Sequence, residues 1–149
     1  ERVAFDEILQ RADILRFHVP KTSETQHMLN RSHFEYINRG IILINTSRGS
    51  ILREQDLADA IEAGWIGGAG LDVFENEPLN PGSRLLLFEN LVLTPHVGAF
   101  TSEAFLRASE AAAQKLIGFF MDGSTMDTLP PKAAWYGAVS PWKTLSKNE

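Results

Sequence analysis

The stretch IILINTSRG, residues 41–49, is the most informative part of the sequence. Its opening run of aliphatic residues is typical of a strand that is buried on both faces. A short polar turn follows at once and leads to Arg48. In open parallel sheets, ligands bind outside the carboxyl ends of the strands. The position of Arg48 directly after a buried strand therefore indicates a ligand-binding residue.

Short apolar runs and amphipathic segments alternate along most of the chain. In the longest amphipathic segment, apolar residues from Phe105 to Phe119 recur every three or four positions, as a helix requires. This alternation predicts an α/β fold with a parallel sheet that helices cover on both faces. The predicted strands are residues 13–19, 41–45, 67–74 and 91–95, and the predicted helices are residues 5–12, 32–37, 54–64 and 102–121.

Several residues mark the expected ends of these helices. Asp6 is a candidate N-cap of the first helix, and Ser32 with Glu35 forms a capping-box pattern for the second. Gly64 is placed to end the third helix. Arg53 stands where an acidic or amide residue would cap that third helix, so we expect its start to be weaker by about 1 kcal/mol.

Composition excludes several classes of function. The 149 residues are 44% hydrophobic and 22% charged, which suits about one globular domain. With 14 basic and 19 acidic residues the net charge is −5, which argues against nucleic-acid binding. Cysteine is absent, so we predict no disulfide, no thiolate metal site and no cysteine nucleophile. We also assign no residue to metal ligation. Without a long apolar run or a signal peptide, we expect a cytoplasmic protein that does not enter membranes.

Three polar residues with reactive side chains follow three predicted strands at equal spacing. Arg48, Asp72 and His96 are each 24 residues apart, enough for a strand and its crossover to the next parallel strand. Taken singly, each has an ordinary structural explanation: a surface ion pair, a helix cap and a satisfied polar residue. Their shared position at strand ends instead predicts one common cleft.

The sequence around these three residues resembles a known family. ADILRFHVP (12–20), IILINTSRG (41–49), GGAGLDVFENEP (67–78) and LVLTPHVGAFT (91–101) resemble the NAD-binding domain of D-isomer-specific 2-hydroxyacid dehydrogenases. The resemblance covers roughly residues 5–120, in order and with the expected spacing. It implies the second half of a doubly wound, parallel Rossmann sheet.

The resemblance also assigns catalytic roles. Arg48 corresponds to the arginine that binds the substrate carboxylate, and its fork of donors suits that group. His96 corresponds to the acid/base histidine, and Glu77 to the carboxylate that orients it and favours its protonated form. Glu75, Asn76 and Glu77 could each be an ordinary solvated loop residue, but we prefer Glu77 for this role because it precedes Pro78, as the family pattern requires.

NAD is the implied cofactor and carries the hydride. Asp72 would accept a hydrogen bond from the nicotinamide amide, and Gly98 would leave room for the ring. His27 and His33 are expected to be surface residues, and His18 has no role in proton transfer within the family. The full set of implied cofactor contacts is Val19, Pro20, Thr46, Ser47, Arg48, Asp72, His96 and Gly98.

The phosphate-binding glycine loop of the family is not recognisable in this sequence. GWIGGAG (64–70) fails the pattern G-x-G-x-x-G because Val73 occupies the third glycine position. We expect its glycines to allow close packing against neighbouring backbone instead. By its motifs, the chain should be the C-terminal half of the NAD-binding domain (1–100), followed by a crossover helix and tail toward a substrate domain (101–149).

These features predict a hydride transfer between NAD and a small D-2-hydroxy acid or 2-oxo acid. D-3-Phosphoglycerate is the first candidate substrate, and a glyoxylate/hydroxypyruvate reductase is the alternative. A second class is an NAD-sensing, corepressor-like binding protein. We expect a homodimer by resemblance, and little activity without the missing N-terminal half. Trp135, Tyr136 and Trp142 are expected to be either a loosely docked terminus or a cap on a neighbouring domain.

Overall fold

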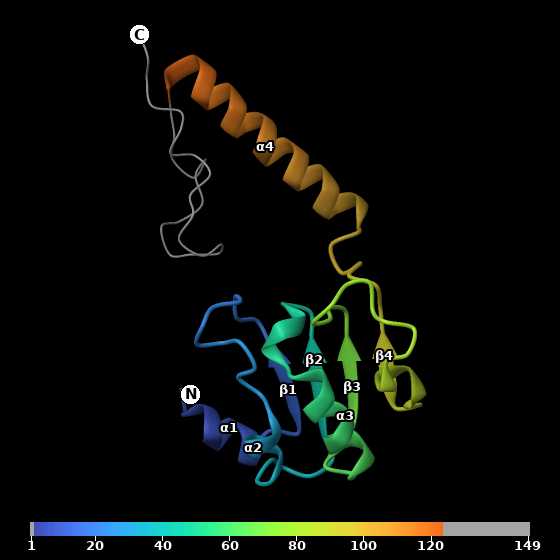
Figure 1. The fold of residues 1–149 in the computed structure, drawn as a ribbon. Helices are drawn as coiled ribbons and strands as arrows, with labels where there is room; N and C mark the ends of the chain where they lie inside the picture. Colours follow the sequence, from blue (N-terminus) through green and yellow to red (C-terminus); the bar gives the residue numbers. More distant parts are fainter. Residues whose placement is uncertain (1, 124–149) are drawn as a thin grey trace. The chain divides into compact units, whose positions relative to one another are not determined.

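The computed structural model describes residues 2–123 and divides the chain into two compact units, Glu1–Thr101 and Ser102–Glu149 (Figure 1). The first unit contains the whole sheet. The second is described by one long helix, α4 (Ser102–Asp122), close to the predicted bounds. None of the helices within residues 2–123 has the length and apolar character that a membrane crossing requires. The predicted roles of Trp135, Tyr136 and Trp142 lie outside the described residues.

The sheet has four parallel strands in the order in which they occur in the chain, and their arrows point the same way in Figure 1. The parallel α/β prediction is therefore confirmed. The strands are β1 (Ile14–Phe17), β2 (Ile41–Asn45), β3 (Ile66–Leu71) and β4 (Leu91–Leu93).

The register of the sheet brings the four strand ends into line. Phe17 pairs with Asn45, Asn45 with Leu71, and Leu71 with Leu93. These are the last residues of their strands, so each following loop begins at the same edge of the sheet. The loops that carry the equally spaced residues Arg48, Asp72 and His96 thus begin side by side along this edge.

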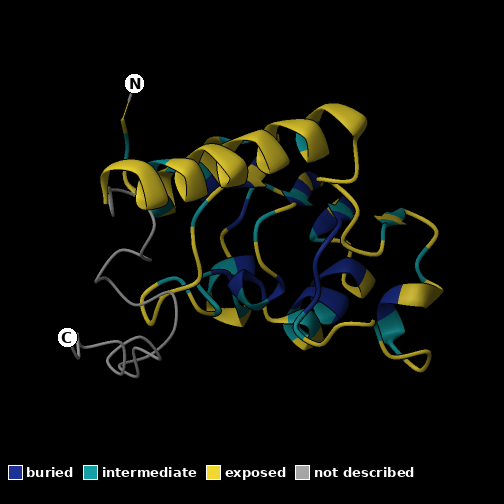
Figure 2. Ribbon diagram, turned by 90° about the horizontal axis from the view of Figure 1, so that it is seen from above, coloured by how far each residue is buried: buried dark blue, intermediate teal, exposed yellow. Residues whose placement is uncertain are grey.

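Helices cover one face of the sheet in the unit Glu1–Thr101, as Figures 1 and 2 show. Leu15, Phe17 and Leu43 point into the core from that face. On the opposite face, Ile14 and Val92 are 63% and 69% exposed. The prediction of helices on both faces is wrong for this unit, because the helices described within it all pack on the same side. The covering elements are α1 (Phe5–Arg11), α2 (Arg31–Phe34), α3 (Glu54–Glu62) and the 3-10 turns η1 (Gly49–Ile51) and η2 (Arg84–Leu87).

Two of the predicted helix starts are wrong. The residue that caps α1 is Ala4, and Asp6 lies in the first turn, where its negative charge suits the helix dipole. The cap of α2 is Asn30, whose side chain accepts from the backbone N–H of Ser32. His33, rather than Glu35, completes that capping box. A cap needs extended backbone at the first position, which Asn30 has.

The start of α3 is capped from another loop. Its N-cap residue, Arg53, makes no capping bond with its side chain, as the sequence indicated. However, the Oε2 atom of Glu75 accepts from the backbone N–H of Glu54 at 3.1 Å. In return the N–H of Glu75 donates to Glu54 Oε1 at 2.5 Å. The missing local cap is therefore replaced by a carboxylate that is 21 residues away in the chain.

The glycines around β3 are partly explained by close packing. A Cβ atom on Gly67 would lie 2.4 Å from the carbonyl oxygen of Gly40, and one on Gly68 would lie 2.8 Å from that of Asn90. The packing prediction is confirmed for these two positions. It is wrong for Gly70, where a Cβ would meet nothing within 4 Å. Gly64 has φ +71° just after α3, as predicted for a helix end.

Candidate active site

Three loops at the carboxyl edge of the sheet are joined by hydrogen bonds. The backbone N–H of Asp72, after β3, donates to the carbonyl of Asn45 at 3.0 Å. The N–H of Thr94, after β4, donates to the carbonyl of Leu71 at 2.9 Å. The loops that carry Arg48 and His96 are therefore linked through the end of β3, Leu71, and the residue after it, Asp72.

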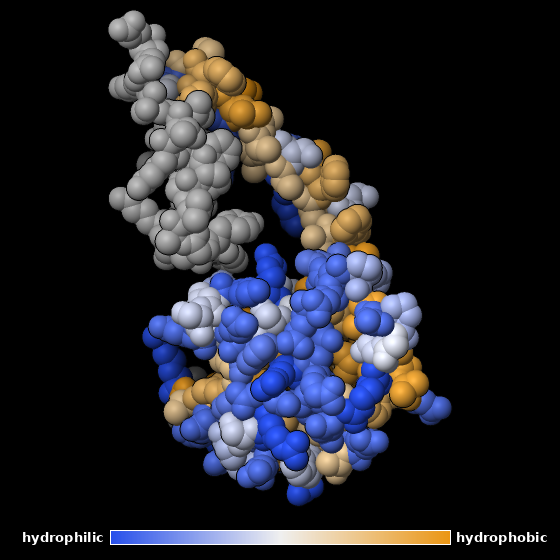
Figure 3. Space-filling model, in the orientation of Figure 1, coloured by the Kyte–Doolittle hydropathy of each residue, from blue (hydrophilic) through white to orange (hydrophobic). Residues whose placement is uncertain are grey.

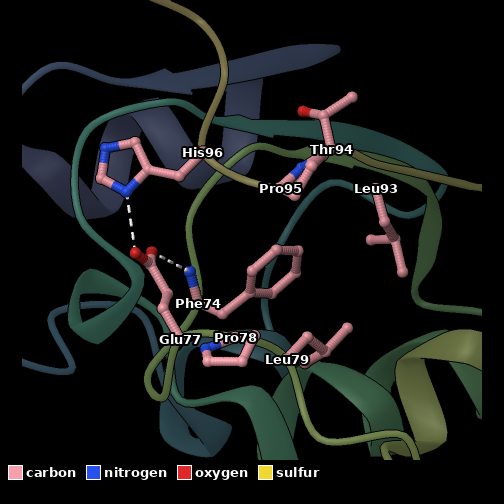
Figure 4. Close-up of a pocket in the computed structure, with 8 residues that line it drawn as sticks. All are labelled: Phe74, Glu77, Pro78, Leu79, Leu93, Thr94, Pro95 and His96. Atoms are coloured by element: carbon pink, nitrogen blue, oxygen red, sulfur yellow. Dashed lines mark hydrogen bonds and ion pairs between the residues drawn. The ribbon is translucent and has the colours of Figure 1, made fainter.

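His96 is paired with Glu77, as Figure 4 shows. The distance from His96 Nδ1 to Glu77 Oε2 is 2.8 Å, and the other carboxylate oxygen accepts from the N–H of Phe74 at 3.0 Å. The hydrogen bond from His96 holds the pKa of Glu77 below its usual value. The Phe74 N–H and the charges of His96 and Arg48 add to this lowering, against a smaller opposing effect of burial.

The His96–Glu77 pair is open to small molecules. The two side chains are 49% and 37% exposed. The second ring nitrogen of His96, Nε2, points away from Glu77 and Phe74 in Figure 4. The pair is thus arranged as a proton donor with a carboxylate behind it.

Arg48 follows the polar turn after β2 and is exposed. Its Nη1 atom donates to the carbonyl of Ser47 at 2.6 Å. Its positive charge contributes to the lowered pKa of Glu77, so the guanidinium and this carboxylate lie within electrostatic reach. The structure therefore brings Arg48, Glu77 and His96 to one edge of the sheet.

Asp72 shapes the loop that carries His96. It is 6% exposed and accepts three hydrogen bonds: from Thr94 Oγ1 at 2.5 Å, Val97 N at 2.9 Å and Gly98 N at 2.8 Å. Burial by itself would raise the pKa of Asp72, but these bonds and the charge of His96 together lower it. The carboxylate is thus held ionised in a nearly closed position.

His96 has a left-handed backbone conformation, with φ +56°. Such a conformation is uncommon for a residue other than glycine and persists only where the surroundings hold it. Asp72 supplies that hold through the N–H groups of Val97 and Gly98, the next two residues. The sequence did not indicate this function of Asp72, nor the hydrogen bond from Thr94.

The remaining predicted cofactor contacts lie along the same edge. Thr46 is exposed and Ser47 half-buried in the turn after β2, while Val19 is half-buried and Pro20 exposed after β1. A Cβ atom on Gly98 would lie 2.9 Å from Asp72 Oδ2. The backbone of residue 98 therefore approaches the Asp72 carboxylate so closely that a side chain there would collide with it.

Two histidines predicted as surface residues are half-buried and bonded. His27 Nε2 lies 2.6 Å from Glu75 Oε1. His33 accepts from the N–H of Asn30 and packs edge-on against Phe5. Both stay partly exposed, which agrees with the surface prediction, but each also has partners in the fold that the sequence did not indicate. Glu75 is thus engaged by His27 and by the start of α3.

An apolar cavity of about 360 Å³ lies beside the His96–Glu77 pair. The apolar side chains of this cavity are on the opposite side of the pair from His96 Nε2 in Figure 4. The cavity therefore lies on the Glu77 side of the pair, and His96 Nε2 points away from it. Its lining consists of Phe74, Glu77, Pro78, Leu79, Leu93, Thr94, Pro95 and His96. Among residues 2–123 no group of three or more potential ligands is arranged to hold a metal ion.

The edge fits the nicotinamide end of a dinucleotide. A carboxylate offers roughly four lone-pair sites, and the three hydrogen bonds to Asp72 leave one for an amide N–H. That free site lies in the same row of loops as His96 and Arg48. The donor set is thus compatible with a carboxamide beside a proton donor.

Comparison with known proteins identifies relatives with named activities. The chain is 43% identical over 119 residues to a glyoxylate reductase of Korarchaeum cryptofilum, covering 80% of this chain and 36% of that protein. It is 40% identical over 115 residues to a D-3-phosphoglycerate dehydrogenase of Archaeoglobus fulgidus, covering 77% and 22%. The chain therefore spans about a third or less of the length of these relatives.

Solved structures agree with these relatives. A glyoxylate reductase from Paecilomyes thermophila superposes with a TM-score of 0.77 at 30% identity, over 82% of this chain and 37% of that one. A D-lactate dehydrogenase from Aquifex aeolicus, complexed with NAD and lactic acid, gives 0.72 at 30% identity, over 79% and 40%.

A family-level comparison covers most of the described chain. Residues 1–98 match the NAD binding domain of the D-isomer specific 2-hydroxyacid dehydrogenases. This range includes β1 to β4 and every residue assigned above to the candidate site. The match, the relatives and the shared fold establish that the chain belongs to the D-isomer specific 2-hydroxyacid dehydrogenase family.

Proposed function

We propose that the longer protein carrying this chain is an NAD-dependent oxidoreductase that interconverts small 2-oxo acids and D-2-hydroxy acids. The observation that carries the proposal is the 2.8 Å contact between His96 Nδ1 and Glu77 Oε2, with Arg48 in electrostatic reach of the same carboxylate. A proton donor, its carboxylate and an anion-binding arginine are the groups that this reaction needs.

In the reduction, Arg48 binds the carboxylate of the 2-oxo acid and polarises its carbonyl. His96 gives the proton on Nε2 to the carbonyl oxygen, which becomes the hydroxyl. Glu77 stabilises the imidazolium before this transfer and keeps Nε2 directed at the substrate. When bound, NADH supplies the hydride that C2 of the substrate accepts.

The cofactor contacts form a second part of the proposal. Asp72 accepts from the nicotinamide carboxamide through its remaining lone pair, and Thr46, Ser47 and Gly98 border the same end of the cofactor. Val19 and Pro20 face the adenosine side. The alignment of the strand ends supports this division, because β1 lies at one side of the row and β4 at the other.

Glyoxylate and hydroxypyruvate are the first substrates to test, with D-3-phosphoglycerate beside them. The names of the relatives support both choices, and the glyoxylate reductase is the more similar of the two described above. The assay follows NADH consumption by the full-length protein over a panel of 2-oxo acids, and NADH formation from NAD with D-3-phosphoglycerate. NADH binding without turnover of any of them would favour the second class, an NAD-sensing binding protein.

Variants at the two cationic residues test the assignment of roles. Arg48→Lys should raise the KM for the 2-oxo acid and lower turnover, because lysine lacks the planar fork of donors. His96→Ala should lower kcat by about 10²-fold or more with NADH binding largely kept. His33→Asn is the matched control, since His33 lies in α2, away from the strand ends. Wild-type kinetics in His96→Ala would contradict the proposed proton transfer.

We also propose a cytoplasmic homodimer in which residues 1–100 are the second half of the NAD-binding domain. Residues 101–149 would return to a substrate domain. The family resemblance supports these points, and the exposed apolar side chains that gather over β4 and η2 support the dimer alone (Figure 3). Those residues are Leu86, Leu87 and Val92, which are 52%, 79% and 69% exposed. Light scattering on the full-length protein tests the dimer, and a monomeric mass would contradict it.

A further inference from the structure

Asn45, the last residue of β2, is completely buried, and both the oxygen and the nitrogen of its side chain bond to the segment Ser47–Arg48. Its Oδ1 atom accepts from Ser47 N at 3.1 Å and from Ser47 Oγ at 2.9 Å. Its Nδ2 atom donates to the carbonyl of Arg48 at 2.9 Å. A buried amide is costly unless its hydrogen bonds are made, so these bonds define one conformation of the turn.

The same residue is tied to the neighbouring loop. The carbonyl of Asn45 accepts from the N–H of Asp72 at 3.0 Å. After Arg48, a Cβ atom on Gly49 would lie 1.9 Å from the carbonyl carbon of Phe74. The turn is therefore pressed against the segment that leads to Glu77, and both of its ends are fixed.

Arg48, in contrast, is exposed, and its guanidinium donates to the carbonyl of the preceding residue, Ser47. The direction of the side chain thus follows from the backbone of the turn that Asn45 holds. We infer that Asn45 is a positioning residue for Arg48: it fixes the turn so that the guanidinium meets the substrate carboxylate beside His96. This inference rests on the proposed function.

The test compares Asn45→Ala with Asn38→Ala in the full-length protein. Asn38 is a matched control, because its Nδ2 atom also donates to backbone, to the carbonyl of Ala12 at 3.1 Å, but before the other end of β2. For Asn45→Ala we expect the KM for the 2-oxo acid to rise about tenfold or more, since small displacements of a positioning group have large kinetic effects. Asn38→Ala should leave the KM near wild type.

A double variant distinguishes a positioning role of Asn45 from a general loss of structure. In Arg48→Ala protein, measured at high enzyme concentration, adding Asn45→Ala should lower kcat/KM by less than about twofold, because the group it positions is gone. An equal loss in both backgrounds would overturn the inference, as would a normal KM in Asn45→Ala.

Two further results are distinguishable. If the wild-type protein reduces no 2-oxo acid, the proposed function is wrong. If the wild-type protein is active and Asn45→Ala has the same KM, only the inference about Asn45 is wrong. If Asn45→Ala does not fold, Asn45→Asp replaces it, since that variant has the same shape and keeps an acceptor for Ser47. It loses the donor to the Arg48 carbonyl, so the same rise in KM is expected, and unchanged kinetics would overturn the inference.

Discussion

Replacing Glu75 by alanine should destabilise the fold, because this carboxylate joins three segments. It caps α3 through the N–H of Glu54 at 3.1 Å, and it contacts His27 Nε2 at 2.6 Å in the loop after β1. The N-cap residue Arg53 makes no capping bond of its own. Losing a cap costs about 1 kcal/mol.

The contact with His27 adds less. The two side chains are 34% and 25% exposed, and the pair is ionic only while the histidine is protonated. A partly exposed pair contributes about 0.5 kcal/mol. Burial raises the pKa of Glu54 and the charge of Glu75 raises it further, so removing Glu75 also relieves some repulsion. The expected loss for Glu75→Ala is therefore about 1 kcal/mol, with 1.5 kcal/mol as an upper limit.

Urea unfolding of the full-length protein measures this loss as a lower midpoint at an unchanged m-value. Glu75→Gln keeps an acceptor for the N–H of Glu54 and should lose about half as much. Glu89→Ala, at an exposed position before β4, should stay within about 0.5 kcal/mol of wild type. An unchanged midpoint in Glu75→Ala would show that the start of α3 does not depend on this loop.

Three further predictions concern the candidate site. The pKa of Glu77 is lower in the folded protein than its usual value of 4.5. Its carboxylate therefore stabilises the fold at pH values above 4.5, and this contribution is lost as the pH falls through the lowered pKa. The difference in unfolding free energy between wild type and Glu77→Gln should therefore shrink as the pH falls below 4.5, and a difference independent of pH would contradict the ionised pair. Asp72→Asn should cost about 1–3 kcal/mol in urea unfolding and also lower kcat, because an amide cannot accept all three bonds and one buried N–H is left unsatisfied. Residues 1–149 alone should bind NADH more weakly than micromolar in a fluorescence titration, since the sequence lacks the glycine loop that holds the pyrophosphate; micromolar affinity would refute this.

The sequence was most predictive where local chemistry decides the structure. The aliphatic run before Asn45 and the glycine-rich apolar segment before Asp72 correctly predicted parallel strands, because strand burial leaves a direct trace in composition. Equal spacing then predicted that Arg48 and His96 would reach the same edge. The register of the strand ends confirms this placement.

Pairings between distant residues could not be predicted in the same way. Glu75 and Glu77 are separated by one residue, and composition alone cannot tell which of them meets His96. The fold directs Glu77 to His96 and Glu75 to His27, which is 48 residues away in the chain. Likewise, Asn30 rather than Ser32 caps α2 because its backbone is extended, a property that the residue type does not reveal.

The precision of the site depends on a register that is set at the far end of the sheet. Ile41 pairs with Ile66 but Ile42 pairs with Gly68, so Gly67 is an extra residue in β3. Without that irregularity, Asn45 would face Gly70 instead of Leu71. A shift of one residue also moves a side chain to the other face of the sheet. The N–H of Asp72 would then no longer meet the carbonyl of Asn45, and the link between the Arg48 loop and the His96 loop would be lost. Gly67 therefore supports the chemistry from the opposite edge, because only glycine fits 2.4 Å from the Gly40 carbonyl.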